Sequence, residues 1–297
     1  MVGTLTLVRF ESSPIENMKI PLEPLVTRDR KQGQLPIQEA IMNDQYLVQT
    51  PILDFNAEEI QRLIEDRGWG FLPPSERIGA AYRFVRNEIL FGYNSRDDLS
   101  ASAVLTDGYG QCNTKGTLLM ALLRALGIPC RLHGFTIDKQ LQRGVVPELV
   151  YPLAPKSIIH SWVEVYYDEN WINLEGFILD DRVLLSLQTA FPNRKSLCAY
   201  GVGTECLQDP RVIWEGRSTY IQTTGINRDF GAFDNPDEFY ASHQQLTGLK
   251  GILYRFVVRH WMNRRVARIR NGQVPDIPGG EQNLATPQTR ILSLEGV

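Results

Sequence analysis

One cysteine of the chain stands where a thiol could act as a nucleophile. Cys112 follows the segment Gly-Tyr-Gly-Gln and stands shortly before an apolar run that begins after Lys115, extends to Leu126 and is broken only by Arg124. This run predicts a buried helix, and the start of a helix carries free backbone N–H groups and a partial positive charge. Both features favour a thiolate and can stabilise an oxyanion. The position indicates a nucleophilic cysteine; the competing interpretation is a buried, inert thiol.

A histidine in a regular apolar setting could serve as the base for this thiol. His160 lies in the segment Ile-Ile-His-Ser-Trp-Val-Glu-Val-Tyr, residues 158–166, which predicts a β-strand. Apolar residues on both sides of His160 predict a half-buried side chain held in one orientation, as a base that meets a thiol requires. The alternative is a satisfied core histidine. His133, His243 and His260 are weaker candidates for the base.

A third residue should hold the imidazole in its useful tautomer. A turn centred near Asp168 would bring the segment after Trp171 back beside His160. Glu175 would then lie about opposite His160, and Asn173 would point to the same face of the hairpin. The residues alone leave Glu175 and Asn173 open as the orienting group.

Other side chains near these positions are candidates for oxyanion or substrate contacts. Gln111, Tyr93 and Asn94 could each supply an oxyanion donor, and the sequence does not choose between them. Trp162 could line a substrate groove, although two tryptophans in one hairpin, here with Trp171, more often pack across the strands.

Several segments in order resemble the core of the transglutaminase-like superfamily. They are "GYGQCNTKGTLLMALLRALGIPCR" and "HSWVEVYYDENWINLE", preceded by "YRFVRNEILFGY" and "DDLSASAVLTDGYGQC". The resemblance extends over residues 46 to 182 and implies a papain-like arrangement, with a Cys on a central helix and a His and an Asp on neighbouring strands. It implies Cys112 as nucleophile and His160 as base. It places Glu175 where the family usually has Asp.

The elements that would position these residues follow from hydrophobic spacing and turn signals. Helices are expected over 54–66, with Asn56 as cap, from Pro73 onward, and over 112–126. Strands are expected over 130–136, 158–167 and 171–174, and a further helical region continues from Asn235 to about Arg270. This order predicts an α+β fold. With the resemblance, we expect a papain-like, transglutaminase-like core in which the nucleophile helix packs on an antiparallel sheet, plus a helical C-terminal extension.

The chain is expected to divide into four parts. These are an N-terminal extension over 1–45, the transglutaminase-like catalytic core over 46–190, a largely helical C-terminal extension over 191–272, and a mobile tail over 273–297. The tail is predicted from its prolines and glycines.

The C-terminal helical region is strongly basic. Between Lys250 and Arg270 there are seven Lys or Arg residues and no acid. Its apolar positions recur at three- and four-residue steps: Ile252, Leu253, Phe256, Val257, His260 and Trp261. We expect this stripe to dock on the protein itself or at a subunit interface. Binding to a peripheral anionic surface is the less favoured interpretation.

Composition excludes several classes of function. A net charge of -3 and a pI near 5.9 give no global attraction to nucleic acid. No run of about 18 apolar residues predicts an integral membrane segment, and no signal peptide is recognisable. The four cysteines lack zinc-site or disulfide spacing, which fits a reducing cytoplasm. Asp97 and Asp98 predict a solvated turn in preference to a metal site, so we expect neither metal nor cofactor.

The predicted reaction is acyl transfer from an amide or peptide substrate through a thioester on Cys112. Hydrolysis, as in an amidase or peptidase, is favoured because water is always present and no dedicated amine site is recognisable. Transamidation to an amine acceptor is the first alternative. The second is a non-catalytic binding module that retains the fold, motivated by the glutamate at position 175. The sequence does not indicate an oligomeric state.

Overall fold

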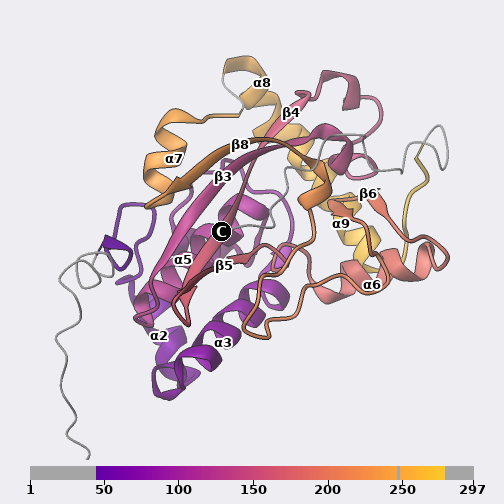
Figure 1. The fold of residues 1–297 in the computed structure, drawn as a ribbon. Helices are drawn as coiled ribbons and strands as arrows, with labels where there is room; N and C mark the ends of the chain where they lie inside the picture. Colours follow the sequence, from indigo (N-terminus) through magenta and orange to yellow (C-terminus); the bar gives the residue numbers. More distant parts are fainter. Residues whose placement is uncertain (1–44, 246–247, 278–297) are drawn as a thin grey trace, which may run out of the picture.

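A four-stranded antiparallel sheet forms the centre of the protein (Figure 1). The computed structural model describes residues 45–245 and 248–277. The strands lie in the order β5-β4-β3-β8 and span Cys130–Asp138 (β3), Ser157–Tyr167 (β4), Asn170–Leu174 (β5) and Ile226–Phe233 (β8). β4 and β5 form the predicted hairpin. Its turn residues Asp168 and Glu169 have φ values of 52° and 63°, the left-handed conformation that matches the twist of a tight hairpin.

The central helix α5 (Cys112–Ala125) packs against β4 and β3. All its residues from Cys112 to Arg124 are buried, as the apolar run after Lys115, broken only by Arg124, predicts. Lys115 is enclosed with them, and its Nζ donates to the carbonyls of Ile178 (2.9 Å) and Arg86 (3.2 Å). Burial lowers the pKa of Lys115 well below its ordinary value. α5 is therefore the buried scaffold that carries Cys112.

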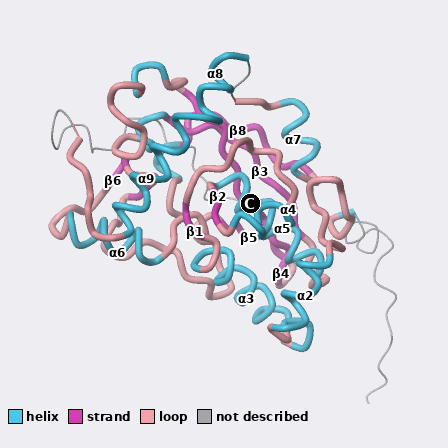
Figure 2. Tube along the Cα trace, turned by 180° about the vertical axis from the view of Figure 1, so that it is seen from behind, coloured by secondary structure: helices cyan, strands magenta, loops and turns pink. Residues whose placement is uncertain are grey.

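Three helices that precede α5 in the chain pack against it. They are α2 (Glu58–Asp66), α3 (Pro74–Asn87) and α4 (Ala101–Asp107), accompanied by the 3₁₀ turn η1 (Trp69–Phe71). A short parallel pair, β1 (Leu90–Phe91) with β2 (Tyr109–Gly110), connects this layer to the start of α5. Figure 2 shows α2 and α3 at one end of the molecule and α8 at the other.

The first helix begins later than its spacing predicts. α2 starts at Glu58, its N-cap residue is Ala57, and no side chain caps it, so the expected capping role of Asn56 is wrong. The carboxylate of Asp54 accepts hydrogen bonds from the backbone N–H and hydroxyl of Ser102 near the start of α4. Because Asp54 is held by this distant contact, residues before 58 form a turn in place of the first helical turn.

Further elements lie beside the sheet. The link between β3 and β4 contains two 3₁₀ turns, η2 (Lys139–Gln142) and η3 (Tyr151–Leu153). The segment after β5 contains α6 (Asp181–Ala190), the hairpin of β6 (Leu197–Ala199) and β7 (Val202–Thr204), and the 3₁₀ turn η4 (Thr223–Gly225). β8 completes the central sheet by pairing with β3, although the extension was expected to be largely helical. Its sequence, Ile-Asn-Arg-Asp-Phe-Gly-Ala-Phe, lacks an apolar alternation because it is an edge strand in which no residue is fully buried.

The C-terminal region is helical, in separate pieces. α7 (Pro236–Ser242) begins at the predicted cap Asn235, whose side chain accepts from the N–H of Glu238 at 2.9 Å. α8 (Gly248–Leu253), the π-helical turn η5 (Tyr254–Val258) and α9 (Arg259–Arg270) then follow without a break. No helix in the described ranges has both the length and the apolar content needed to cross a bilayer.

The expected stripe of this C-terminal helix does not dock on the described part of its own chain, whereas docking at a subunit interface stays a prediction. Ile252, Phe256 and Trp261 are 55%, 67% and 39% exposed, and Leu253, Val257 and His260 are exposed as well. The residues that face the core are instead Tyr254, Val258, Met262, Val266 and Ile269. Residues 252–262 carry apolar side chains on both faces, and a helix at the surface of one chain can bury only one of them.

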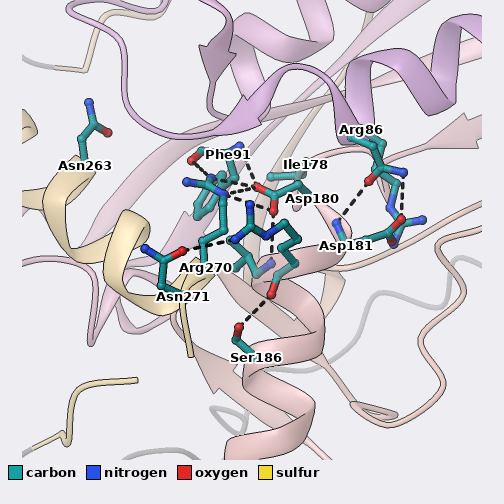
Figure 3. A network of polar contacts seen from close by, with 12 residues as sticks. Arg86, Phe91, Ile178, Asp180, Asp181, Ser186, Asn263, Arg270 and Asn271 are labelled. Atoms are coloured by element: carbon teal, nitrogen blue, oxygen red, sulfur yellow. Dashed lines mark hydrogen bonds and ion pairs between the residues drawn. The ribbon is translucent and has the colours of Figure 1, made fainter. Parts of the chain in front are cut away.

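An ion pair fixes the end of α9 to the core (Figure 3). Arg270 bonds Asp180, with the closest contact at 2.8 Å, and donates to the carbonyl of Phe91 at 2.7 Å. Asp180 in turn accepts from the N–H of Phe91 at 3.1 Å and caps α6.

The chain beyond α9 also packs on the core, since Tyr200 donates to the carbonyl of Pro275 at 2.6 Å and Ile277 is buried. The predicted mobile tail is therefore wrong for residues 273–277. Its remainder, 278–297, and residues 1–44 of the predicted N-terminal extension lie outside the described residues.

Candidate active site

Cys112 lies at the first position of α5, with 8% of its surface exposed, and lines a pocket of about 410 Å³. Its Sγ is 3.6 Å from Oδ1 of Asn113. The glycine at 110 is required by close packing, because an added Cβ would lie 2.6 Å from Oγ1 of Thr114 and 2.9 Å from Cγ of Lys115. Gly110 therefore lets the preceding loop pack closely on α5. The Cys112 thiol lies at the pocket surface, while the residues that follow it up to Arg124 are buried.

His160 is fully buried on β4 and bonds a carboxylate through one ring nitrogen. Its Nε2 lies 2.9 Å from Oε1 of Glu175. Its Nδ1 is buried and makes no hydrogen bond within residues 45–245 and 248–277. Cys112 is a close neighbour of the ring and raises the pKa of His160. Because Nε2 is occupied, Nδ1 is the nitrogen available to the thiol.

The charge of His160 is set by the same two neighbours. Burial alone would lower the pKa of this imidazole, but the interactions with Cys112 and Glu175 outweigh burial and raise it to about 10. The cationic imidazole is therefore stabilised when Cys112 is a thiolate and Glu175 a carboxylate. A cationic imidazole beside a thiol is the arrangement in which a cysteine acts as a nucleophile at neutral pH.

Glu175 is fully buried and held by three contacts. One oxygen meets His160, and the other accepts from the backbone N–H groups of Ile221 (2.8 Å) and Gln222 (3.0 Å). Two backbone donors on one oxygen fix the orientation of the carboxylate. The remaining oxygen is thereby aimed at the imidazole.

The hairpin register explains why a glutamate can occupy this position. The last pair of β5 is Leu174 with Val163, so Glu175 lies one residue beyond the strand and does not face His160 directly as the sequence suggested. Its longer side chain reaches His160 diagonally along β4. Asn173 pairs with Glu164, and its Nδ2 donates to the hydroxyl of Tyr220 at 2.9 Å. Of the two open candidates, Glu175 therefore contacts His160.

Asp97 holds the residues at the N-terminal end of α5, a role that the sequence did not suggest. Its Oδ1 accepts from the side-chain amides of Gln111 (2.9 Å) and Asn113 (3.0 Å). Burial raises the pKa of Asp97, although these two donors act against the rise. Asp98 is exposed and pairs with Arg96 at 3.3 Å. The expectation of a solvated turn therefore fits Asp98 and is wrong for Asp97.

Two of the three oxyanion candidates already use their donors. Gln111 donates to Asp97, and its Oε1 accepts from the N–H of Asn94 at 2.9 Å. The amide of Asn94 donates to Asp107 (2.8 Å) and to the carbonyl of Tyr109 (3.1 Å). Both side chains therefore fix the loop that precedes α5, and neither is hydrogen-bonded to Cys112 in the described structure.

Tyr93 is the candidate whose donor remains available. Its side chain lines the pocket and is 5% exposed, and its hydroxyl has no hydrogen-bond partner among the described residues. Burial, and then the charge of Cys112, raise the pKa of Tyr93 above its ordinary value. A proton that stays on the hydroxyl next to the nucleophile is suited to stabilise an oxyanion. The backbone amide of Tyr93 is held by Asn263 of α9 at 2.7 Å.

Trp162 does not line this pocket. It is 1% exposed and packs against Phe135, with ring centroids 4.1 Å apart. Its ring also contacts His133 and Tyr220. Trp162 therefore supports the sheet beneath His160, in agreement with the packing interpretation and not with a substrate contact.

The pocket joins a polar region to an apolar one. The polar part surrounds Cys112 and includes Gln111, Asn113 and Asp97. The apolar part comes from β3, β4, the link between them and α9, and its side chains include Ile137, Leu141, Val146, Val150, Ile158 and Met262. A ligand bound here could place a polar group at the thiol and an apolar group in the remaining space.

Sequence reasoning missed three contributors to the site. Asp97 was one of two adjacent acids in a polar loop, and no local signal separates it from Asp98. The N–H groups of Ile221 and Gln222 belong to the backbone, which carries no side-chain signature. Tyr254 of η5 lines the pocket, donates to the carbonyl of Asn94 at 3.2 Å and has a pKa raised by burial. Its position in the core-facing stripe 254, 258, 262 was the available signal.

Residues 69–176 match the family model of the transglutaminase-like superfamily. The chain carries a transglutaminase-like core. The matched residues include Cys112, His160 and Glu175. A crystal structure of a "Putative Cysteine Protease" from Cytophaga hutchinsonii is similar at 21% identity, with 47% of this chain and 42% of that chain aligned and a TM-score of 0.34. This chain thus spans less than half of that structure, a likeness too low to assign an activity. The comparison with curated proteins gives no match.

Proposed function

We propose that the protein cleaves an amide bond through a thioester on Cys112, with water as the final acyl acceptor. The observation that carries the proposal is the fully buried His160–Glu175 pair, whose free Nδ1 adjoins a cysteine at the surface of a pocket. The thiol at the start of the helix would act as the nucleophile and the oriented imidazole as the base. The carboxylate, which is held by two backbone donors, would orient the imidazole.

In the first half-reaction the Cys112 thiolate attacks the amide carbonyl carbon. The carbonyl electrons move to oxygen, and the resulting oxyanion accepts hydrogen bonds from the N–H of Cys112 and the hydroxyl of Tyr93. When the carbon–oxygen double bond re-forms, the carbon–nitrogen bond breaks and the imidazolium of His160 gives its proton to the leaving amine. The products are a free amine and a thioester on Cys112.

In the second half-reaction water attacks the thioester carbonyl while neutral His160 takes a proton from it. The carbon–sulfur bond then breaks, the acid leaves and the thiolate–imidazolium pair is restored. Glu175 keeps Nε2 as a donor throughout, so that Nδ1 carries the transferred proton. An amine in place of water would give a new amide, which is transamidation.

The proposal is tested by competition between cysteines for a small thiol-directed electrophile at neutral pH. Mass spectrometry of the native protein should show that Cys112 reacts fastest, relative to the rate of each cysteine in the denatured chain. Cys206 is exposed and Cys130 is buried with a raised pKa, so they provide two controls of different access. Equal normalised rates for the four cysteines would refute an activated nucleophile and leave a binding module.

The identity of the acyl acceptor, water or an amine, is tested with an activated aryl ester as substrate. Formation of the thioester releases a burst of the phenol. Mass spectrometry should detect an acyl adduct on Cys112 in the wild-type protein and none in Cys112→Ser at that position. The adduct should decay in water alone. Decay that requires an added primary amine would replace hydrolysis by transamidation.

A further inference from the structure

The helix α8–η5–α9 presents an apolar outer face to solvent. The face consists of Leu249, Ile252, Leu253, Phe256, Val257, His260 and Trp261, all of which are exposed. Leu249 is 84% and Phe256 67% exposed. Such a gathering of large apolar side chains on one helix exceeds the scattered exposure that is ordinary for a protein surface. The apolar outer face therefore indicates a binding surface.

Basic side chains accompany this outer face. Lys250, Arg255, Arg264 and Arg268 are exposed, and none has an ion pair in the described part of the chain. No acidic residue occurs between Gly248 and Gly272. By contrast Arg270, on the same helix, is turned inward and paired with Asp180. The exposed cations are therefore available to an external anion.

We propose that the outer face of α8–η5–α9 binds the surface of an anionic lipid bilayer. Aromatic and aliphatic side chains beside Lys and Arg, on one exposed helix, match the chemistry of that surface: apolar groups enter the acyl boundary and cations meet the headgroups. A second copy of the chain is a poorer occupant because two basic faces repel each other. An acidic protein would satisfy the cations without requiring Leu249 and Phe256 to protrude.

The outer face is continuous with the mouth of the pocket that contains Cys112. Lys250, Leu253 and Arg255 line the pocket and are also exposed. Leu153, on the link between β3 and β4, lines it too and is 67% exposed. A bilayer on the outer face would therefore lie beside the pocket entrance. Binding does not depend on the chemistry at Cys112, so the two proposals can fail separately.

The test is co-sedimentation of the full-length protein with vesicles of phosphatidylcholine, with or without phosphatidylglycerol. The protein should sediment with the anionic vesicles and remain largely in solution with phosphatidylcholine alone. Raised salt should weaken binding, since headgroup contacts are screened. Cys112→Ala should bind like the wild-type protein, which separates this surface from catalysis.

Two sets of variants assign the contact to the outer face. Ile252→Ser with Phe256→Ser should weaken vesicle binding by at least about tenfold, because buried apolar area is lost. The matched control is Phe71→Ser with Ile213→Ser, two exposed apolar residues elsewhere, which should change nothing.

Lys250→Gln, Arg264→Gln and Arg268→Gln together should weaken binding by roughly fivefold per charge. Their matched control neutralises Arg62, Lys195 and Arg228, which are exposed on other elements.

Several results would overturn the proposal. Absence of sedimentation with anionic vesicles is one, and equal binding by the Ile252/Phe256 variant is another. If the wild-type protein is a dimer in solution and Phe256→Ser converts it to a monomer, the outer face is an interface between copies. Circular dichroism of each variant shows that a loss of binding comes from a folded protein, since all the substituted side chains are exposed.

Discussion

Two histidines on neighbouring strands of the sheet each contact a glutamate, yet they differ in what is left free. His133 on β3 uses both ring nitrogens, with Nδ1 2.6 Å from Glu164 and Nε2 2.8 Å from Asp229. His160 on β4 uses only Nε2, on Glu175, and its Nδ1 makes no hydrogen bond among the described residues. A pair of acidic partners immobilises a ring, whereas a single partner orients it and leaves the second nitrogen for proton transfer.

The surroundings of the two pairs strengthen this difference. Glu164 also bonds Arg131 at 2.5 Å, so the His133 pair is part of an ion network at the sheet surface. Glu175 has two backbone N–H donors and no cationic side chain other than His160 as an ion-pair partner in the described structure. The charge of Glu175 is therefore directed at His160, next to a thiol. The comparison predicts that the first pair stabilises the fold and the second pair supports chemistry.

The largest expected effect comes from removing each histidine. His160→Ala should slow formation of the Cys112 acyl adduct by about 10²–10⁴-fold, since both the base and the cationic partner of the thiolate are lost. His133→Ala should change the rate by no more than a few fold. Stopped-flow measurement of phenol release from the aryl ester checks both. Similar losses in the two variants would remove the distinction drawn here.

Exchange of the carboxylates sharpens the comparison. Glu175→Gln should slow adduct formation roughly 10²–10³-fold, because an amide at this position no longer stabilises the imidazolium and can favour the wrong tautomer. Glu164→Gln should leave the rate nearly unchanged and lower the free energy of unfolding by about 1–3 kcal/mol. Urea unfolding of both variants measures the second quantity. A rate loss for Glu164→Gln in a folded protein would contradict the structural role.

The parts of this site that the sequence predicts are those with a local signature. The run after Cys112 predicts a buried helix, and the turn at 168–170 with its flanking strands predicts the hairpin that brings Glu175 to His160. The backbone donors of Ile221 and Gln222 come from a segment more than forty residues after Glu175, and no spacing rule connects the two. For residues 252–262 the pattern is ambiguous in itself. Both faces are apolar, so only tertiary packing decides which one is buried.

A smaller effect is expected at the hydroxyl of Tyr93. Tyr93→Phe should slow acylation of Cys112 by roughly tenfold to hundredfold, because one of two oxyanion donors is lost. It should leave the alkylation rate of Cys112 unchanged, because alkylation forms no oxyanion. His160→Ala should slow both reactions, which makes the pair of assays diagnostic. Equal slowing of alkylation and acylation by Tyr93→Phe would show that Tyr93 acts on the thiol itself.

The smallest effect is a pH dependence of stability that belongs to His133. Burial acts to lower the pKa of His133, but Glu164 and Asp229 outweigh it and the pKa is raised above 6.5. A raised pKa in the folded state means that folding favours the protonated form, so the stabilisation is complete below pH 6.5 and is lost as the pH rises through the folded value. His133→Phe should therefore reduce the free energy of unfolding by roughly 1–2 kcal/mol in mildly acidic solution and by less in alkaline solution. His160 also has a raised pKa, so the measurement is the difference between wild type and variant by urea unfolding across pH, in which its contribution cancels. A difference that does not vary with pH would mean that His133 acts through packing against Phe135 and Trp162, with which its ring is in contact, and that its charge contributes nothing to the fold.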